Sequence, residues 1–475
     1  MRAVEEGGRK KEDGGRLAGA EGSGARQVTI GDVTELRVEQ VRPSGSGFFT
    51  YVDIGSIDRD SKTIVAPKTM PKSEAPSRAR QLLRAGDVLV SMTRPNLNAV
   101  ALVPSELDGA IASTGFNVLR PKRIEGKALY YTVQTTQFVE AMCSKVQGAL
   151  YPAVRPSDIA SYIFHLPSSL SVQRSIVATI DAQLSRLEAG VAALQRAQAN
   201  LKRYRASVLK AACEGRLVPT EADLARREGR DYETGAQLLQ RILAERRKAW
   251  TGKGKYKEPE PPDTTGLPEL PEGWCWASVG QLSTKVVDGV HKKPTYVPSG
   301  IPFVTVRNLT AGAGISLERL HYVTEADHAE FSKRTNVERG DILISKDGTL
   351  GVVRIVDTDV AFSVFVSVAL VKPVCRAMGM FLLHALSAPQ VQLQMVPKGS
   401  GLQHIHLEDL RADCIPVAPM EEQHRIVAEV ERRLSIADRL MANLGDDLGR
   451  AGRMRQAVLL GAFGGRASLA SASTG

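Results

Sequence analysis

The sequence contains 475 residues, carries a formal net charge of +10 and is 43% hydrophobic. This length accommodates about three domains with cores of their own. No apolar run reaches the roughly 20 residues of a membrane helix, so we expect no membrane association. The charged, glycine-rich first 26 residues lack the apolar segment of a secretory signal. The five cysteines stand singly, which argues against a disulfide scaffold or a zinc ribbon and predicts a cytoplasmic protein.

In chain order, the sequence alternates mixed segments with long helical ones. We expect a disordered extension at 1–26, a first α+β domain at 27–168, a long helix at 169–215, a linker with one basic helix at 216–269, a second α+β domain at 270–418, a second long helix at 419–465 and a disordered tail at 466–475. Within the domains, short β-rich runs lie at 48–57, 87–92, 301–309, 341–345 and 365–373, and a helical stretch lies at 127–142. These strands do not alternate regularly with helices, which favours α+β domains over a doubly wound sheet.

The chain repeats itself at a distance of about 250 residues. The run QRSIVATIDAQLSRL from Gln173 returns as QHRIVAEVERRLSIA from Gln423, and RAGDVLVS at 84–91 returns as ERGDILIS at 338–345. This period far exceeds that of a solenoid or propeller, so each copy corresponds to a domain with an appended helix. The repeat predicts two pseudo-twofold-related halves with two similar surfaces.

Both long helical segments carry apolar residues at alternating spacings of three and four, as in a heptad seam. The seam residues are Ile180, Leu184, Leu187, Val191, Leu194, Leu201 and Val208 in the first helix and Val430, Leu434, Met441, Leu444, Leu448 and Val458 in the second. We expect the two helices to form an antiparallel coiled coil; the alternative is that each packs on its own domain. Residues 176–213 would span roughly 57 Å, or about 17 base pairs of duplex.

Positive charge is concentrated near the linker. Residues 201–258 contain 15 Lys or Arg and 8 Asp or Glu, a net charge of +7. Such a segment favours contact with a DNA backbone or an acidic protein, and a solvated linker has a similar composition.

Catalytic signatures are missing from the sequence. It contains no GxxxxGKS/T phosphate loop, no glycine-rich strand–loop–helix unit for a dinucleotide or S-adenosylmethionine, and no NPPY or DPPY tetrapeptide. His404, His406 and His424 have no carboxylate or cysteine at ligand spacing. Asp341 and Lys346 lack the further carboxylates that a magnesium-dependent nuclease requires. We therefore expect no catalytic, cofactor-binding or metal-binding residues in this chain.

Several short motifs occur in a distinctive order. LPEGW from Leu270 precedes the second domain, GDVLVS and GDILIS lie inside the two domains, GRLVP from Gly215 follows the first helix, and the helices begin at Gln173 and Gln423. Together they resemble the DNA-specificity subunit of type I restriction–modification systems, over nearly the whole chain from residue 27. The first domain departs from this pattern, because ARQVTIGDVTELRVEQV stands where an LPxGW motif would be.

The resemblance implies that each α+β domain is a target-recognition domain reading one half of a bipartite double-stranded DNA site. It implies that the helices act as a spacer and as a docking site for two methyltransferase (modification) subunits, joined optionally by restriction/translocation subunits. S-adenosylmethionine, ATP and Mg would then be bound by those partners. Two alternatives are a self-sufficient DNA-modifying enzyme with an unrecognised site and a coiled-coil scaffold for proteins alone.

Candidate DNA contacts are polar and basic side chains in predicted loops, because these types bind base edges and phosphates. In the first domain they are Arg94, Asn96, Asn98, Lys145, Gln147, Tyr151 and Arg155. In the second domain they are His291, Lys292, Lys293, Arg307, Asn308, Lys346, Lys398, Ser400, Gln403 and His404.

Overall fold

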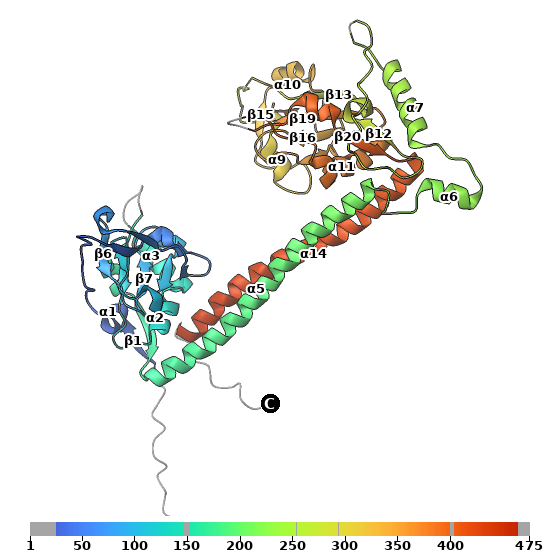
Figure 1. Cartoon of the computed structure of the whole chain (residues 1–475). Coiled ribbons are helices and arrows are strands. Elements are labelled where there is room, and N and C mark those ends of the chain that lie inside the picture. The colour runs from blue at the N-terminus through green and yellow to red at the C-terminus, as the bar shows by residue number, and fades with distance from the viewer. Residues whose placement is uncertain (1–24, 147–151, 253, 293, 400–402, 464–475) are drawn as a thin grey trace, which may run out of the picture. The chain divides into compact units, whose positions relative to one another are not determined.

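The computed structural model describes residues 25–146, 152–252, 254–292, 294–399 and 403–463 (Figure 1). The chain divides into two compact units, and both long helices, α5 (Leu170–Cys213) and α14 (Met420–Phe463), contribute to both. Unit 1 contains the first α+β domain, α5 up to Leu194 and α14 from Asp446 onward. Unit 2 contains the chain from Gln195 to Gly445.

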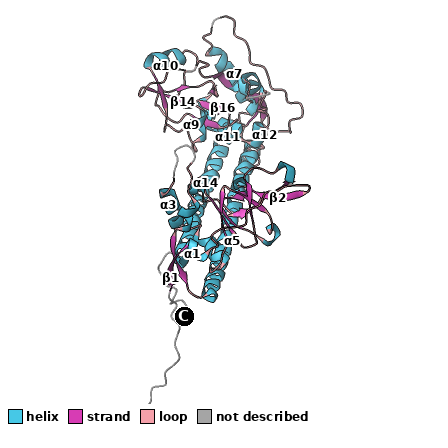
Figure 2. Cartoon of the chain, turned by 90° about the vertical axis from the view of Figure 1, so that its left-hand side faces the viewer, coloured by secondary structure: helices cyan, strands magenta, loops and turns pink. Residues whose placement is uncertain are grey.

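Unit 1 is built from short strands and four short helices (Figure 2). Its sheets have the strand orders β5-β2-β9-β6, β10-β7-β8, β1-β11 and β3-β4, with β2 and β9 parallel. The strands are β1 (Ala25–Thr29), β2 (Phe48–Val52), β3 (Ile57–Asp58), β4 (Thr63–Ile64), β5 (Lys68–Pro71), β6 (Ala79–Leu82), β7 (Val88–Ser91), β8 (Val100–Leu102), β9 (Ile111–Ser113), β10 (Phe116–Leu119) and β11 (Ile163–Pro167). The α-helices are α1 (Ile30–Val33), α2 (Gly126–Thr132), α3 (Thr136–Ser144) and α4 (Pro156–Ala160).

Unit 2 has sheets of strand order β13-β19-β16-β17, β15-β14-β18 and β12-β20. The strands are β12 (Cys275–Ser278), β13 (Ser283–Asp288), β14 (Ile301–Val304), β15 (His321–Val323), β16 (Ile342–Ser345), β17 (Val353–Ile355), β18 (Ser363–Val364), β19 (Val368–Pro373) and β20 (Cys414–Val417). The helices are α6 (Glu221–Glu228), α7 (Gly235–Lys248), α8 (Val279–Leu282), α9 (Val306–Thr310), α10 (Glu325–Ser332), α11 (Gly379–Ser387), α12 (Pro389–Gln392) and α13 (Leu407–Ala412). None of the described helices has both the length and the apolarity of a membrane span. The expected α+β chain with a long helix is confirmed.

Several elements recur in the same order in the two units. The first strand pairs antiparallel with the last strand of its domain, β1 with β11 and β12 with β20. A one-turn helix with a capping box comes next in each case, α1 and α8. The motifs GDVLVS and GDILIS end in the corresponding strands β7 and β16, each between two antiparallel neighbours. ARQVT therefore forms the first strand of its domain although no LPxGW motif precedes it.

The structure differs from the sequence expectations in three local details. Ala25 and Arg26, assigned above to a disordered extension, pair with β11, while residues 1–24 and the tail from 464 lie outside the described residues. The stretch at 127–142 is two helices, because Thr135 accepts a hydrogen bond from Phe138 N and caps α3. The segment 216–269 contains α6 as well as the expected basic helix α7.

The segment before the second domain packs into the core of unit 2. Leu238 and Ile242 of α7 are fully buried in the same cluster as strands β16 and β19. Most arginines that made this segment look like an anion-binding surface have carboxylate partners within it or beside it. These ion pairs are Arg226–Asp223, Arg226–Glu272, Arg230–Glu221, Arg230–Glu228, Arg241–Glu233 and Arg247–Glu258. These arginines are thus held in ion pairs, while residues 201–258 keep their net charge of +7, which already counts five of these carboxylates.

The two long helices pack against each other inside each unit. In unit 1, Ile180 and Leu184 share a core with Leu459 and Phe463. In unit 2, Val208 and Leu209 share a core with Val430 and Leu434. Early residues of one helix thus accompany late residues of the other, which is antiparallel pairing. All the seam residues named above are buried or half-buried.

Candidate nucleic-acid interface

A buried carboxylate surrounded by cations lies at the end of β13 in unit 2. Asp288 is 4% exposed. Its Oδ1 atom is 3.2 Å from Nε2 of His291 and is bonded by the Arg334 guanidinium, and its Oδ2 atom is 3.6 Å from Nζ of Lys346. Burial opposes ionisation, but the His291 hydrogen bond and the nearby cations hold the pKa of Asp288 below its ordinary value. The carboxylate therefore stays ionised and fixes three basic groups in one place.

His291 and Lys346, both candidates from the sequence, are brought together by Asp288. Arg334, which follows α10, was missed by the sequence reasoning. It lies 46 residues from Asp288 in the chain, so no local spacing signals the contact. Its side chain is 54% exposed and thus available to a ligand while it is held by the carboxylate. Lys346 is 10% exposed at its side chain and mainly fixes the geometry.

The glycine loop containing residues 398–404 lies next to Lys346. Lys398 and His404 exchange two backbone hydrogen bonds of 3.0 Å, and Ile405 N donates to Lys346 O at 2.9 Å. The rings of His404 and His406 are 4.5 Å apart, and Lys398 Nζ is 2.8 Å from Asp409 Oδ1. Gln403 is exposed, and Ser400 lies outside the described residues. Lys346 thus links the Asp288 cluster, through its side chain, to the segment from His404 to Ile405, through its backbone.

The remaining candidates of the second domain differ in their exposure. Arg307 and Lys292 are exposed, and Lys293 lies outside the described residues. Asn308 is buried, where its Oδ1 atom accepts a hydrogen bond from Thr305 N at 3.0 Å and its Nδ2 atom donates to Ser316 O at 3.1 Å. Because both ends of this buried amide are engaged, Asn308 stabilises the turn that contains it.

In the first domain, the candidates lie in a turn and in two helix ends. Arg94 and Asn98 adopt positive φ angles of 50° and 44°, and Arg94 N donates to Pro152 O at 2.8 Å. Arg94 and Asn96 are exposed, and Asn98 is half-buried. Lys145 Nζ donates to Ser161 Oγ at 3.0 Å, so this lysine ties α3 to α4. Arg155 is exposed at the start of α4; Gln147 and Tyr151 lie outside the described residues.

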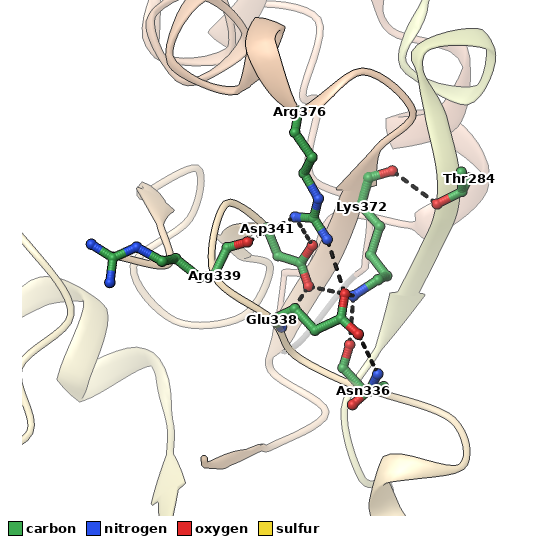
Figure 3. Close-up of polar contacts among 7 residues, drawn as sticks. All are labelled: Thr284, Asn336, Glu338, Arg339, Asp341, Lys372 and Arg376. Atoms are coloured by element: carbon green, nitrogen blue, oxygen red, sulfur yellow. Dashed lines mark hydrogen bonds and ion pairs between the residues drawn. The ribbon is translucent and has the colours of Figure 1, made fainter. Parts of the chain in front are cut away.

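The GDILIS motif supplies a structural ion-pair network (Figure 3). Asp341 is fully buried, and its two oxygens are each 2.6 Å from a cation, Nζ of Lys372 and Nη1 of Arg376. In GDVLVS, Asp87 is likewise buried and accepts two hydrogen bonds from Arg120, at 2.9 and 2.8 Å. Each aspartate also accepts the backbone N–H three residues before it. Asp341 and Lys346 therefore face different partners and do not form a nuclease-like pair.

Among the described residues, no group of three or more His, Cys, Asp or Glu side chains is placed to hold a metal ion. The arrangement supplies fixed cations, exposed amides and imidazoles, which are the groups that bind phosphates and base edges.

Comparison with known proteins agrees with this chemistry. The family model described as "Type I restriction modification DNA specificity domain" matches residues 288–443. The type I restriction enzyme EcoBI specificity subunit of Escherichia coli is 25% identical over 304 residues, which are 62% of this chain and 56% of that protein. Residues 288–443 thus match a type I DNA-specificity domain, and the chain is similar to type I specificity subunits.

Two further likenesses extend over more of this chain. The EcoDI specificity subunit of Escherichia coli is 23% identical over 353 residues, 73% of this chain and 71% of that protein. A solved chain from a structural study of assembly and conformational transition of the type I R-M system has a TM-score of 0.62 and 26% identity. That likeness covers 92% of this chain and 97% of the solved one. The alignment to EcoBI spans little more than half of that relative.

Proposed function

We propose that this chain is the sequence-reading subunit of a type I restriction–modification complex. Each α+β domain would read one half of a bipartite DNA site, and the chain would make or break no covalent bond itself. The observation that carries the proposal is the framework that the two units share, with β1, α1, β7 and β11 in one corresponding to β12, α8, β16 and β20 in the other. Two domains with the same framework would each bind one of two similar DNA half-sites.

The long helices support a spacer role. Their antiparallel packing in each unit matches an arrangement in which the halves are related by a pseudo-twofold axis. The helix length would then set the distance between half-sites. Inserting two whole turns into α5 and the matching turns into α14 should lengthen the gap in the recognised sequence. An unchanged gap would exclude the spacer role.

An apolar groove supports docking of a modification subunit. The groove, of about 750 Å³, lies in unit 1 and is lined by Leu187, Gly190, Val191 and Leu194 of α5 and by Ala451, Met454 and Val458 of α14. Met454 is 58% exposed. Exposed apolar surface of this kind usually marks a protein interface. Met454→Glu should reduce co-purification of the modification subunit, while Val360→Glu, at another exposed apolar position, should not.

The partners would carry S-adenosylmethionine and, in a restriction complex, ATP and Mg. The proposal therefore predicts that the chain binds DNA alone and that methylation requires the partner. Methyl transfer by the isolated chain would favour the self-sufficient enzyme, and DNA binding without strong salt dependence would favour the protein scaffold.

The decisive experiment maps modified bases across the genome with and without this gene. A split methylated motif should disappear on deletion. Exchanging residues 272–417 for the equivalent domain of another such subunit should change only one half of that motif. Changes in both halves would contradict the assignment of one domain to each half.

A further inference from the structure

A cavity of about 420 Å³ in unit 1 is lined by three arginines, Arg59, Arg78 and Arg94. They come from three separate segments: the turn between β3 and β4, the residue before β6, and the turn after β7. Apolar side chains, including Ile54 and Leu97, complete the wall. The arginine side chains are exposed, so an external ligand can reach them.

The described part of the chain provides no carboxylate partner for any of these three guanidinium groups. This contrasts with Arg120 in the same domain, which is neutralised by Asp87 at 2.8 Å. Like charges that converge without a counterion repel one another, and the repulsion is relieved when an anion binds. Guanidinium groups match phosphate oxygens and the guanine edge in a bidentate manner.

The backbone that carries two of these arginines is held in place before any ligand binds. In the β3–β4 turn, Asp58 Oδ1 accepts hydrogen bonds from Asp60 N and Ser61 N, both at 2.8 Å. Lys62 Nζ then donates to Asn98 O at 2.7 Å, which ties this turn to the Arg94 turn. Tyr130 Oη donates to Lys62 O at 2.9 Å and anchors the pair of turns on α2. Such fixed turns reduce the entropy lost on binding.

Lys62 adds a further cation beside the cavity. Burial lowers its pKa, and the nearby guanidinium groups of Arg455 and Arg59 lower it further, while Asp60 and Asp58 act in the opposite direction. Burial is the largest of these effects, so the lowered pKa mainly reflects desolvation of the Lys62 amine, and the smaller Arg59 effect places that guanidinium near it.

We propose that this arginine cavity is a DNA-contact site of the first domain. Arg94, held in the left-handed turn, would read the major-groove edge of a guanine in the first half-site, and Arg59 and Arg78 would bind flanking phosphates. The sequence reasoning named Arg94 but neither of the other two. This inference rests on the proposed function and names residues that perform it.

The test uses the full complex with its modification subunits and a duplex carrying the mapped bipartite site. Affinity is measured over a series of salt concentrations and over single-base substitutions in both halves. Arg59→Gln and Arg78→Gln should each reduce the slope of log affinity against log salt by about one, with base preference unchanged. Arg94→Gln should lower affinity by roughly 5- to 150-fold and relax the preference at one G·C pair of the first half only. Arg123→Gln, an exposed arginine of the same domain outside the cavity, is the control.

The outcomes separate this inference from the function on which it rests. If the wild-type complex binds no bipartite site, the proposed function fails. If the wild type binds but the triple variant R59Q/R78Q/R94Q keeps its affinity, salt slope and base preference, the function stands and the arginine cavity is excluded. Relaxed preference in the second half would also overturn the assignment of Arg94. Circular dichroism and thermal unfolding check that each variant is folded.

Discussion

Arg455 of α14 donates a hydrogen bond to Glu188 of α5 at 3.1 Å. The residues 250 positions away in the repeat form the same pair, since Arg205 of α5 bonds Asp438 of α14. Each arginine lies near the C-terminal end of its helix, and its acidic partner lies on the other long helix. The duplication thus preserves a contact between helices and not only a sequence motif. The same contact between α5 and α14 thus occurs once in each unit.

The Arg455 contact predicts a modest contribution to stability. Its side chain is 22% exposed and also donates to Oε1 of the buried Gln134 at 3.1 Å. Arg455→Ala should therefore lower the free energy of unfolding by about 1–2 kcal/mol, because it leaves a buried amide oxygen without its donor. Arg453→Ala, at an exposed position two residues away, should change it by less than about 0.5 kcal/mol. Denaturant unfolding measures both variants. Equal losses of unfolding free energy would contradict a stabilising role of the Arg455 contacts.

A larger effect is expected at Asp341. Asp341→Asn removes the fully buried charge that Lys372 and Arg376 share, and Lys372 is itself 14% exposed at its side chain. Glu338 still pairs with both cations, at 3.2 and 3.0 Å, so the loss of the charged hydrogen bonds should cost roughly 2–3 kcal/mol of unfolding free energy. The matched control is Asp359→Asn, because Asp359 pairs with Arg339 at 2.9 Å but is 80% exposed. That change should cost less than about 1 kcal/mol. A small loss at Asp341 would mean that the network in Figure 3 is structurally unimportant.

Gly215 in GRLVP ends α5 with a φ angle of +63°. A Cβ atom there would lie 2.4 Å from Cγ of Pro271 in the LPEGW motif. Gly215→Ala should thus combine left-handed strain of about 1 kcal/mol with overpacking of about 1–3 kcal/mol. Gly229 has nearly the same φ, +64°, but no atom within 4 Å of its Cβ position, so Gly229→Ala should show the strain alone. Thermal unfolding of both variants measures the difference, and its absence would contradict close packing of the two motifs.

Asp413, just before β20, predicts a pH dependence of stability. Burial raises its pKa to about 7, with a smaller contribution from Asp409. The unfolded carboxyl titrates near 4, so the folded state binds the proton more tightly and this contribution to stability is lost as pH rises from about 4 through 7. Asp413→Asn should flatten the stability profile over that range and make the protein relatively more stable at pH 8. Asp357→Asn, at an exposed carboxylate, should leave the profile unchanged. If the stability of Asp413→Asn varied with pH in parallel with that of the wild type, this would contradict a raised pKa of Asp413.

Arg334 should contribute to DNA binding by the second domain. Arg334→Gln removes an exposed charge while His291 and Lys346 still face Asp288. Affinity for the cognate duplex should fall, and the salt slope should decrease by about one if the contact is to phosphate. Arg339→Gln is the control, since Arg339 is 61% exposed but paired with Asp359. Binding curves that coincide with the wild type would remove Arg334 from the interface.

Local sequence patterns predicted the long helices and the α+β character of the domains. The heptad spacing from Ile180 onward and the alternating runs in GDVLVS and GDILIS depend on neighbours within a few residues, which is the range over which helix and strand periodicity operates. The same patterns missed α6, whose Ala222 and Ala225 are buried although the helix is mostly charged. They also predicted that the linker lies outside the core, whereas its residues Leu238 and Ile242 belong to the core of unit 2.

In the candidate site, too, some features could be predicted from the sequence and others depend on tertiary contacts. The sequence by itself determined the duplication, the two helices and the residue types available in the loops, because these follow from order and spacing along the chain. Only the tertiary structure decided that Arg334 joins His291 and Lys346 around Asp288, that Asn308 is occupied in a turn, and that Arg59 and Arg78 meet Arg94. These contacts join segments up to 58 residues apart (Asp288 and Lys346), and chain folding, not local periodicity, brings such segments together.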